Sequence, residues 1–125
     1  MMRLLLKKDP QVENQKIIVS LSAQRATVFN AVGEIIYTTR ISSGKKGFAT
    51  PKGTFVITNK YREWKSTIYD GASMPYFQRF SCSDFGFHQG VVLGYPASHG
   101  CLRVPAGNAQ KLFSLTELGD RVIIK

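Results

Sequence analysis

The sequence predicts a mainly β domain, sandwich-like or partly closed, with one main helix. Short runs rich in β-branched and aromatic residues recur along the chain, as is typical of strands. One segment, residues 105–115, carries an apolar stripe at helical spacing. The 125 residues suffice for a single domain with its own core, which we place at residues 16–125, after an irregular lead-in of residues 1–15.

The N-terminal half contains four predicted strands. Each is a run dominated by Ile, Val, Thr or aromatic residues, and the four runs cover residues 16–22, 25–29, 34–42 and 53–59. A short glycine-containing turn between the second and third runs predicts a hairpin. A Ser-, Gly- and Lys-rich loop separates the third run from the fourth.

The C-terminal half is less regular. Residues 61–71 are polar and aromatic without a clear period, which predicts a surface excursion. Residues 90–97 contain Gly and Pro and cannot be regular throughout. The helix over 105–115 starts with a proline, which suits a first helical turn. Three short strands complete the prediction, at residues 78–80, 85–88 and 121–125.

The chain is strongly basic, with 17 Lys and Arg against 8 Asp and Glu and a formal net charge of +9. Such a charge favours anionic partners such as nucleic acid, anionic lipid or an acidic wall polymer, although it also suits a merely soluble surface. The basic residues are scattered and no nucleic-acid-binding motif accompanies them, so we expect no nucleic-acid partner. No apolar run approaches the roughly 20 residues of a membrane span. The run Leu4–Leu6 is shorter than the about 7–15 residues of a signal-peptide core, so no export leader is visible.

The segment Ser98-His99-Gly100-Cys101-Leu102-Arg103 holds one of the two cysteines and one of the two histidines, and His88 lies just upstream. A cysteine becomes a strong nucleophile as thiolate, which requires a nearby base or positive field. The combination predicts a cysteine active site. A Cys82–Cys101 disulfide would consume the nucleophile, so we expect Cys101 to be free and Cys82 to be a small buried filler.

This segment closely resembles the signature of the L,D-transpeptidase catalytic domain of the YkuD type, a family of bacterial cell-wall enzymes. Further similar stretches follow the family order from about Lys16 to Lys125, namely Thr50-Pro51-Lys52-Gly53-Thr54-Phe55, Met74-Pro75-Tyr76-Phe77 and Gly94-Tyr95-Pro96-Ala97. The resemblance implies mixed sheets packed together, with a helix beside the catalytic cysteine. It also implies acylation of the cysteine by carbapenem-type β-lactams.

The candidate nucleophile is Cys101, and the spacing of the residues leaves open whether His88 or His99 is its base. The resemblance implies that His88 takes the thiol proton and that a main-chain carbonyl, here that of Gln89, orients the ring. Glycine or serine is more usual at that position, but any residue supplies a carbonyl. Asp84, four residues before His88, is the alternative as an orienting acid.

The other candidate residues shape the site or bind substrate. Backbone N–H groups around His99, Gly100 and Cys101 are expected to stabilise an oxyanion, with a structural ring as the alternative role of His99. Ser98 is expected to fix the turn by local hydrogen bonds. Arg103 is either a ligand for a substrate carboxylate, or an exposed arginine or a member of a structural ion pair. Tyr76 and Tyr95 line a cleft or belong to the core.

The implied reaction is peptidoglycan L,D-transpeptidation. Cys101 forms a thioester with a stem tetrapeptide, D-Ala leaves, and an amine acceptor takes the acyl group. Water as acceptor would make the same site an L,D-carboxypeptidase or endopeptidase. No cofactor or metal is required, and the implied substrate lies in the periplasm or cell wall.

Two alternatives come from other classes of protein. A zinc site could combine His88, His99 and Cys101, although no paired metal-binding spacing accompanies them. A non-catalytic module could bind an anionic wall polymer through its basic surface, which would leave the clustered cysteine and histidines unexplained. The residues leave the acceptor and the oligomeric state open.

Overall fold

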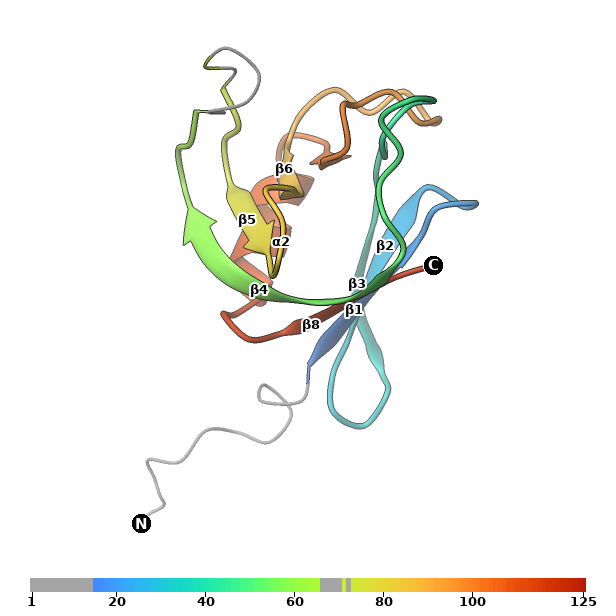
Figure 1. The fold of residues 1–125 in the computed structure, drawn as a ribbon. Helices are drawn as coiled ribbons and strands as arrows, with labels where there is room; N and C mark the ends of the chain where they lie inside the picture. The colour runs from blue at the N-terminus through green and yellow to red at the C-terminus, as the bar shows by residue number, and fades with distance from the viewer. Residues whose placement is uncertain (1–14, 66–70, 72) are drawn as a thin grey trace.

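The computed structural model describes residues 15–65, 71 and 73–125, and it has the mainly β fold that the sequence predicts (Figure 1). Within these residues, eight strands and one helix follow one another along the chain. They are β1 (Lys16–Ser20), β2 (Arg25–Phe29), β3 (Ile35–Arg40), β4 (Gly53–Tyr61), β5 (Phe77–Phe80), β6 (Gly86–Gln89), β7 (Leu102–Val104), α2 (Asn108–Leu115) and β8 (Arg121–Ile124).

The strands form one continuous mixed sheet in the order β3-β2-β1-β8-β4-β5-β6-β7. The pairs β1–β8 and β6–β7 are parallel and the others antiparallel. Strand β4 joins the two halves, because residues 53–56 pair with β8 and residues 57–61 pair with β5, with a register shift after Ile57. Figure 1 shows β4 as a long curved ribbon. The sandwich-like arrangement is therefore one folded sheet whose halves share β4.

The core comes from strands that bury alternate side chains. Ile17 and Val19 of β1, and Val122 and Ile124 of β8, are at most 1% exposed, as expected for two central parallel neighbours. The helix α2 lies against β6 and buries Leu112. Burying each such aliphatic side chain stabilises the fold by about 1.5–3 kcal/mol. This core supports the ends of β6 and β7.

The predicted strands agree with the structure to within two residues at each end. One strand, β7, was not predicted. The helix begins at Asn108 and not at Pro105, because Gly107 has φ +85° and is not helical. The predicted hairpin turn is present, and the side chain of Asn30 accepts the backbone N–H groups of Val32 and Glu34 there.

The predicted surface excursion extends the β4–β5 pair outward. The N–H of Tyr76 donates to the carbonyl of Arg62, and the N–H of Met74 to that of Trp64, each at 2.8 Å. Residues 66–70 of the predicted excursion lie outside the described residues.

Most of the predicted lead-in, residues 1–14, also lies outside the described residues. Its last residue, Gln15, is buried and donates to the carboxylate of Asp120 at 2.8 Å. In the described ranges, no helix is long and apolar enough to cross a membrane.

Candidate active site

His88 and Cys101 belong to neighbouring strands. Strands β6 and β7 pair in parallel, with Phe87 opposite Leu102 and His88 opposite Arg103. Phe87 and Leu102 are buried in the core, so His88 and Arg103 face the other side of the sheet. Cys101 precedes β7 directly, two residues before Arg103, and the charge of Arg103 acts on its thiol. The parallel pairing thus places the candidate base and cation on one face, and the candidate nucleophile directly before the strand that carries the cation.

The imidazole of His88 is oriented by the main chain. Its Nδ1 lies 2.8 Å from the carbonyl oxygen of Gln89. Because a carbonyl oxygen only accepts, Nδ1 carries the proton and Nε2 keeps its lone pair. Burial lowers the pKa of His88; the bond to Gln89 raises it less, and the positive charge of Arg103 lowers it further. The ring is therefore neutral at pH 7, as a general base must be.

The Cys101 thiol is half-buried and is not part of a disulfide. Burial raises the pKa of Cys101, and a hydrogen bond from the Gly86 backbone and the charge of Arg103 partly oppose that rise. At neutral pH the resting protein consequently holds Cys101 as a neutral thiol and His88 as a neutral imidazole.

The side chain of Ser98 bridges the turn that leads into Cys101. Its hydroxyl donates to the carbonyl of Cys101 and accepts the N–H of Gly100 at 3.0 Å. Gly100 has φ +128°, a conformation that favours glycine. The N–H of Gly100, one of the expected oxyanion donors, therefore points at Ser98. The N–H of Cys101 has no acceptor in the described part of the chain.

His99 is exposed and packs edge-on against Phe48, with ring centroids 4.7 Å apart at 85°. Phe48 belongs to a loop whose Lys45 N–H donates to the carbonyl of Ser98 at 2.9 Å. The ring of His99 thus holds two loops together, which is the structural role considered for it as the alternative.

Residues 41–44, which we call the strap, lie beside the segment that contains Cys101. Ser42 and Arg103 exchange two backbone hydrogen bonds of 3.0 Å. The carbonyl of Ser43 accepts the N–H groups of Ala97 and Ser98 at 2.8 and 3.0 Å. These bonds connect the first half of the sheet to the residues around Cys101.

Gln24 anchors the strap at Ser43. The buried Gln24 side chain accepts the N–H of Ser43 at 3.0 Å and donates to the Ser43 hydroxyl at 2.8 Å. Neither residue belongs to a local motif, so the sequence does not indicate their role. Their contribution depends on contacts that connect distant parts of the chain.

Arg103 is half-buried, with its aliphatic stem against Gly90, where a Cβ would come within 3.0 Å of Arg103 Cγ. No carboxylate pairs with Arg103 among the described residues. The structural ion pair considered for it is therefore absent there, and its guanidinium is available to an anionic ligand.

The two candidate cleft tyrosines have different surroundings. Tyr95 is 58% exposed. Tyr76 is half-buried and packs edge-on against Phe113 of α2, with ring centroids 5.4 Å apart. Tyr76 also lines a cavity of about 650 Å³. Tyr76 is thus part of a concave surface.

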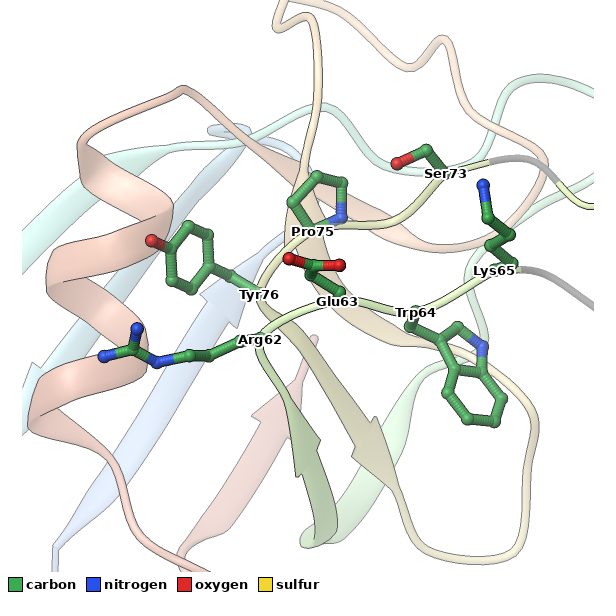
Figure 2. A pocket seen from close by; sticks show the side chains of 7 residues that line it. All are labelled: Arg62, Glu63, Trp64, Lys65, Ser73, Pro75 and Tyr76. Carbon is green, nitrogen blue, oxygen red and sulfur yellow. The ribbon is translucent and has the colours of Figure 1, made fainter.

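The remaining walls of this cavity are both polar and apolar (Figure 2), and they are formed by Arg62, Glu63, Trp64, Lys65, Ser73 and Pro75. Figure 2 shows Arg62 and Tyr76 pointing towards α2, with Lys65 and Ser73 at the other end. The N–H of Gln89 donates to the Pro75 carbonyl at 2.8 Å. The cavity therefore adjoins the end of β6 that carries His88, although His88 itself does not line it.

The acid considered as an alternative orienting group for His88 has another partner. Asp84 is an exposed residue whose carboxylate lies 3.5 Å from the guanidinium of Arg79. The Nδ1 of His88 is instead bonded to Gln89. The geometry therefore favours the Gln89 carbonyl over Asp84 as the group that orients the imidazole of His88.

The prediction that Cys82 is a buried filler is wrong. Cys82 is exposed, and it lies in the turn between β5 and β6 with φ +59°. The turn, and not the core, determines its surroundings. No local sequence pattern indicates that this position falls in the turn between β5 and β6.

The zinc alternative has no support in the geometry. In the ranges that the structure covers, no three His, Cys, Asp or Glu side chains are grouped to hold a metal ion. His88, His99 and Cys101 therefore do not form a ligand set.

Comparison with known proteins identifies the family of this chain. The Bacillus subtilis (strain 168) protein YciB, whose name assigns it provisionally to the L,D-transpeptidases, is 28% identical over 133 residues, covering 92% of this chain and 69% of YciB. An L,D-transpeptidase (Yku) from Stackebrandtia nassauensis superposes with a TM-score of 0.81 at 27% identity, covering 90% of this chain and 55% of that one.

Two further solved structures are similar. L,D-transpeptidase 1 of Mycobacterium tuberculosis has a TM-score of 0.76 at 28% identity, with coverage of 89% and 61%. An L,D-transpeptidase, LdtMt1, in complex with imipenem has a TM-score of 0.80 at 25% identity, with coverage of 89% and 58%. The chain thus spans between 55% and 61% of these three solved structures. Residues 14–124 match the family described as L,D-transpeptidase catalytic domain, YkuD. The chain belongs to the YkuD family of L,D-transpeptidase catalytic domains.

Proposed function

We propose that this domain is a peptidoglycan L,D-transpeptidase with Cys101 as nucleophile and His88 as base. The observation that carries the proposal is the 2.8 Å bond from His88 Nδ1 to the Gln89 carbonyl, on the strand paired with the one that Cys101 precedes. It leaves a neutral imidazole nitrogen as proton acceptor beside a thiol. Membership of the family supports the reaction class.

The first half of the reaction forms a thioester. His88 Nε2 takes the proton from Cys101 as the sulfur attacks the carbonyl that joins the L-configured centre of the third stem residue to D-Ala. The carbon–nitrogen bond then breaks, and His88 returns the proton to the amine of the departing D-Ala. The N–H of Cys101 faces the developing oxyanion, and each such donor is worth about 3 kcal/mol.

The second half transfers the acyl group. An acceptor amine loses a proton to His88 and attacks the thioester, and Cys101 leaves as the thiol. Water in place of the amine gives a carboxypeptidase or endopeptidase from the same intermediate. No step requires a cofactor or a metal.

Substrate recognition rests on charge. Arg103, which has no carboxylate partner among the described residues, is the group we assign to a stem carboxylate. The net charge of +9 suits association with an anionic wall polymer. The partners are therefore peptidoglycan stems, and the site of action is the periplasm or cell wall.

The test is product analysis after incubation with a purified disaccharide-tetrapeptide. We expect wild type to release D-Ala and form dimers, and Cys101→Ala to do neither. Cys82→Ala is the matched control, because it removes the other cysteine, which lies exposed in a turn. Tripeptide without dimer would identify water as the acceptor. An unchanged substrate with retained binding to cell-wall sacculi would favour the non-catalytic module.

A further inference from the structure

The hydroxyl of Thr50 connects two glycines that lie far apart in the sequence. It accepts the N–H of Gly44 at 2.9 Å and donates to the carbonyl of Gly100 at 2.7 Å. Thr50 is only 4% exposed, so both bonds are shielded from water. A hydroxyl has one proton, and that of Thr50 is directed at Gly100, the residue before the candidate nucleophile.

The hydrogen bond from Thr50 to the Gly100 carbonyl also orients the N–H of Cys101. The Gly100 carbonyl and the Cys101 N–H belong to the same planar trans peptide unit, in which the two groups point in opposite directions. Holding the carbonyl against Thr50 therefore directs the Cys101 N–H away from Thr50. That N–H has no acceptor within the described ranges, so it is available to an oxyanion.

This peptide needs a restraint because it adjoins glycine. Gly100 has φ +128°, and glycine adopts such conformations and their alternatives at similar cost. Ser98 holds the Gly100 N–H and the Cys101 carbonyl, which flank the unit on either side. Thr50 is the group that holds the unit itself. If this peptide rotated, its carbonyl rather than its N–H would face the developing negative charge.

Thr50 is itself rigidly placed. It precedes Pro51, which restricts the backbone of Thr50 to extended conformations. Its partner Gly44 lies so close to Phe48 that a Cβ there would meet the Phe48 carbonyl oxygen at 1.8 Å. The hydroxyl therefore has little freedom to follow Gly100 if the loop moves.

We propose that Thr50 is a positioning residue that orients the Gly100–Cys101 peptide so that the Cys101 N–H stabilises the oxyanion. The inference deepens the proposed function and rests on Cys101 as the acylated nucleophile. It also explains the Thr50-Pro51 motif chemically: the threonine supplies the hydroxyl and the proline keeps it in place.

The test compares two reactions of Cys101 in a Cys82→Ser background. Acylation by imipenem forms a sulfur–carbonyl bond and breaks the lactam carbon–nitrogen bond, whose nitrogen takes a proton, and it passes through an oxyanion. Alkylation by iodoacetamide displaces iodide from a saturated carbon and forms no oxyanion. Intact mass gives both rates. The variants are Thr50→Val, Thr50→Ser and, as a control, Thr39→Val, which removes a buried hydroxyl that donates to the Arg40 carbonyl.

We expect Thr50→Val to slow acylation about tenfold or more while alkylation stays within about twofold of wild type. Thr50→Ser should restore acylation, and Thr39→Val should leave both rates unchanged. With disaccharide-tetrapeptide, Thr50→Val should lower kcat and spare KM, because an oxyanion donor acts in the transition state.

Equal losses in acylation and alkylation, or no loss in either, would show that Thr50 serves stability alone and would overturn the proposal. If circular dichroism shows that Thr50→Val does not fold, Thr50→Ala replaces it, and the ratio of its acylation rate to its alkylation rate tests the proposal. A wild type that is alkylated but never acylated also contradicts the proposal. If wild type is acylated by imipenem but does not react with the muropeptide, the proposed substrate is wrong. The role of Thr50 is then decided by the imipenem acylation rates of the variants.

Discussion

The Nδ1 of His88 lies 2.8 Å from the main-chain carbonyl of Gln89, the next residue in the chain. In many cysteine and serine enzymes a carboxylate or amide side chain from elsewhere orients the base. In this domain a main-chain carbonyl orients the imidazole that we propose as the base. The bond fixes the tautomer of His88 and places no negative charge beside the thiol that we propose as the nucleophile.

Replacing the side chain of Gln89 should therefore matter little. We expect Gln89→Ala to keep kcat/KM within about threefold of wild type, because the carbonyl remains in place, and His88→Ala to lose about 10²–10⁴-fold. Steady-state kinetics on disaccharide-tetrapeptide gives both values. A hundredfold loss in Gln89→Ala would mean that the side chain, and not the carbonyl, orients the ring.

The pH profile should separate the base from the thiol. Burial lowers the pKa of His88, so kcat/KM should fall only as pH drops through a value below about 6.5, where the base becomes protonated. Burial raises the pKa of Cys101, so alkylation by iodoacetamide should still be increasing with pH above about 8.5. Both are measured in a Cys82→Ser background. Full alkylation rates already at pH 5 would instead reveal a preformed thiolate–imidazolium pair.

Arg103 should act mainly in binding. Arg103→Met keeps an aliphatic stem against Gly90 but loses the charge, and we expect KM for a stem with a free carboxylate to rise about tenfold. The KM of Arg103→Lys should lie between those of wild type and Arg103→Met, because lysine keeps the positive charge but lacks the guanidinium that binds a carboxylate through two hydrogen bonds. The control is a substrate with that carboxylate amidated, for which the variants should differ little. Equal effects on both substrates would assign Arg103 to the structure of the loop.

Gly86 should tolerate no side chain. A Cβ there would lie 1.8 Å from the carbonyl oxygen of Gln78 on the paired strand, so β5 and β6 would have to separate. We expect Gly86→Ala to lower the free energy of unfolding by about 3 kcal/mol. At Gly33 a Cβ meets nothing within 4 Å, and Gly33→Ala should cost only the strain of its positive φ, about 1 kcal/mol. Urea titrations that gave equal losses for the two variants would contradict this account of the β5–β6 pair.

Most of the fold could be predicted because its strands are locally encoded. The strand Arg25–Phe29 agrees at both ends, since a β-rich run is bounded there by residues that favour turns. The three residues of β7 are too few to give a pattern, and they are extended only because they pair with β6. The helix starts late because of the conformation of Gly107, which composition does not reveal.

The candidate site could be predicted only where its residues are close in sequence. His88, Ser98 and Cys101 lie in a recognisable segment, whereas Thr50 and Gln24 reach it through contacts between distant parts of the chain. The exposed position of Cys82 depends on which residues form the turn after β5, and a lone cysteine carries no signal of that. Local patterns therefore indicate the candidate reacting groups, and tertiary contacts show which groups hold them.

The most direct test of the central claim is the mass of the protein trapped during turnover. Wild type and Cys101→Ser are mixed briefly with disaccharide-tetrapeptide, quenched in acid and digested. The account predicts a disaccharide-tripeptide adduct on the Cys101 peptide of wild type, removed by hydroxylamine as a thioester should be, and none on Cys101→Ser. An adduct on any other residue, or D-Ala release by Cys101→Ala at the wild-type rate, would contradict it.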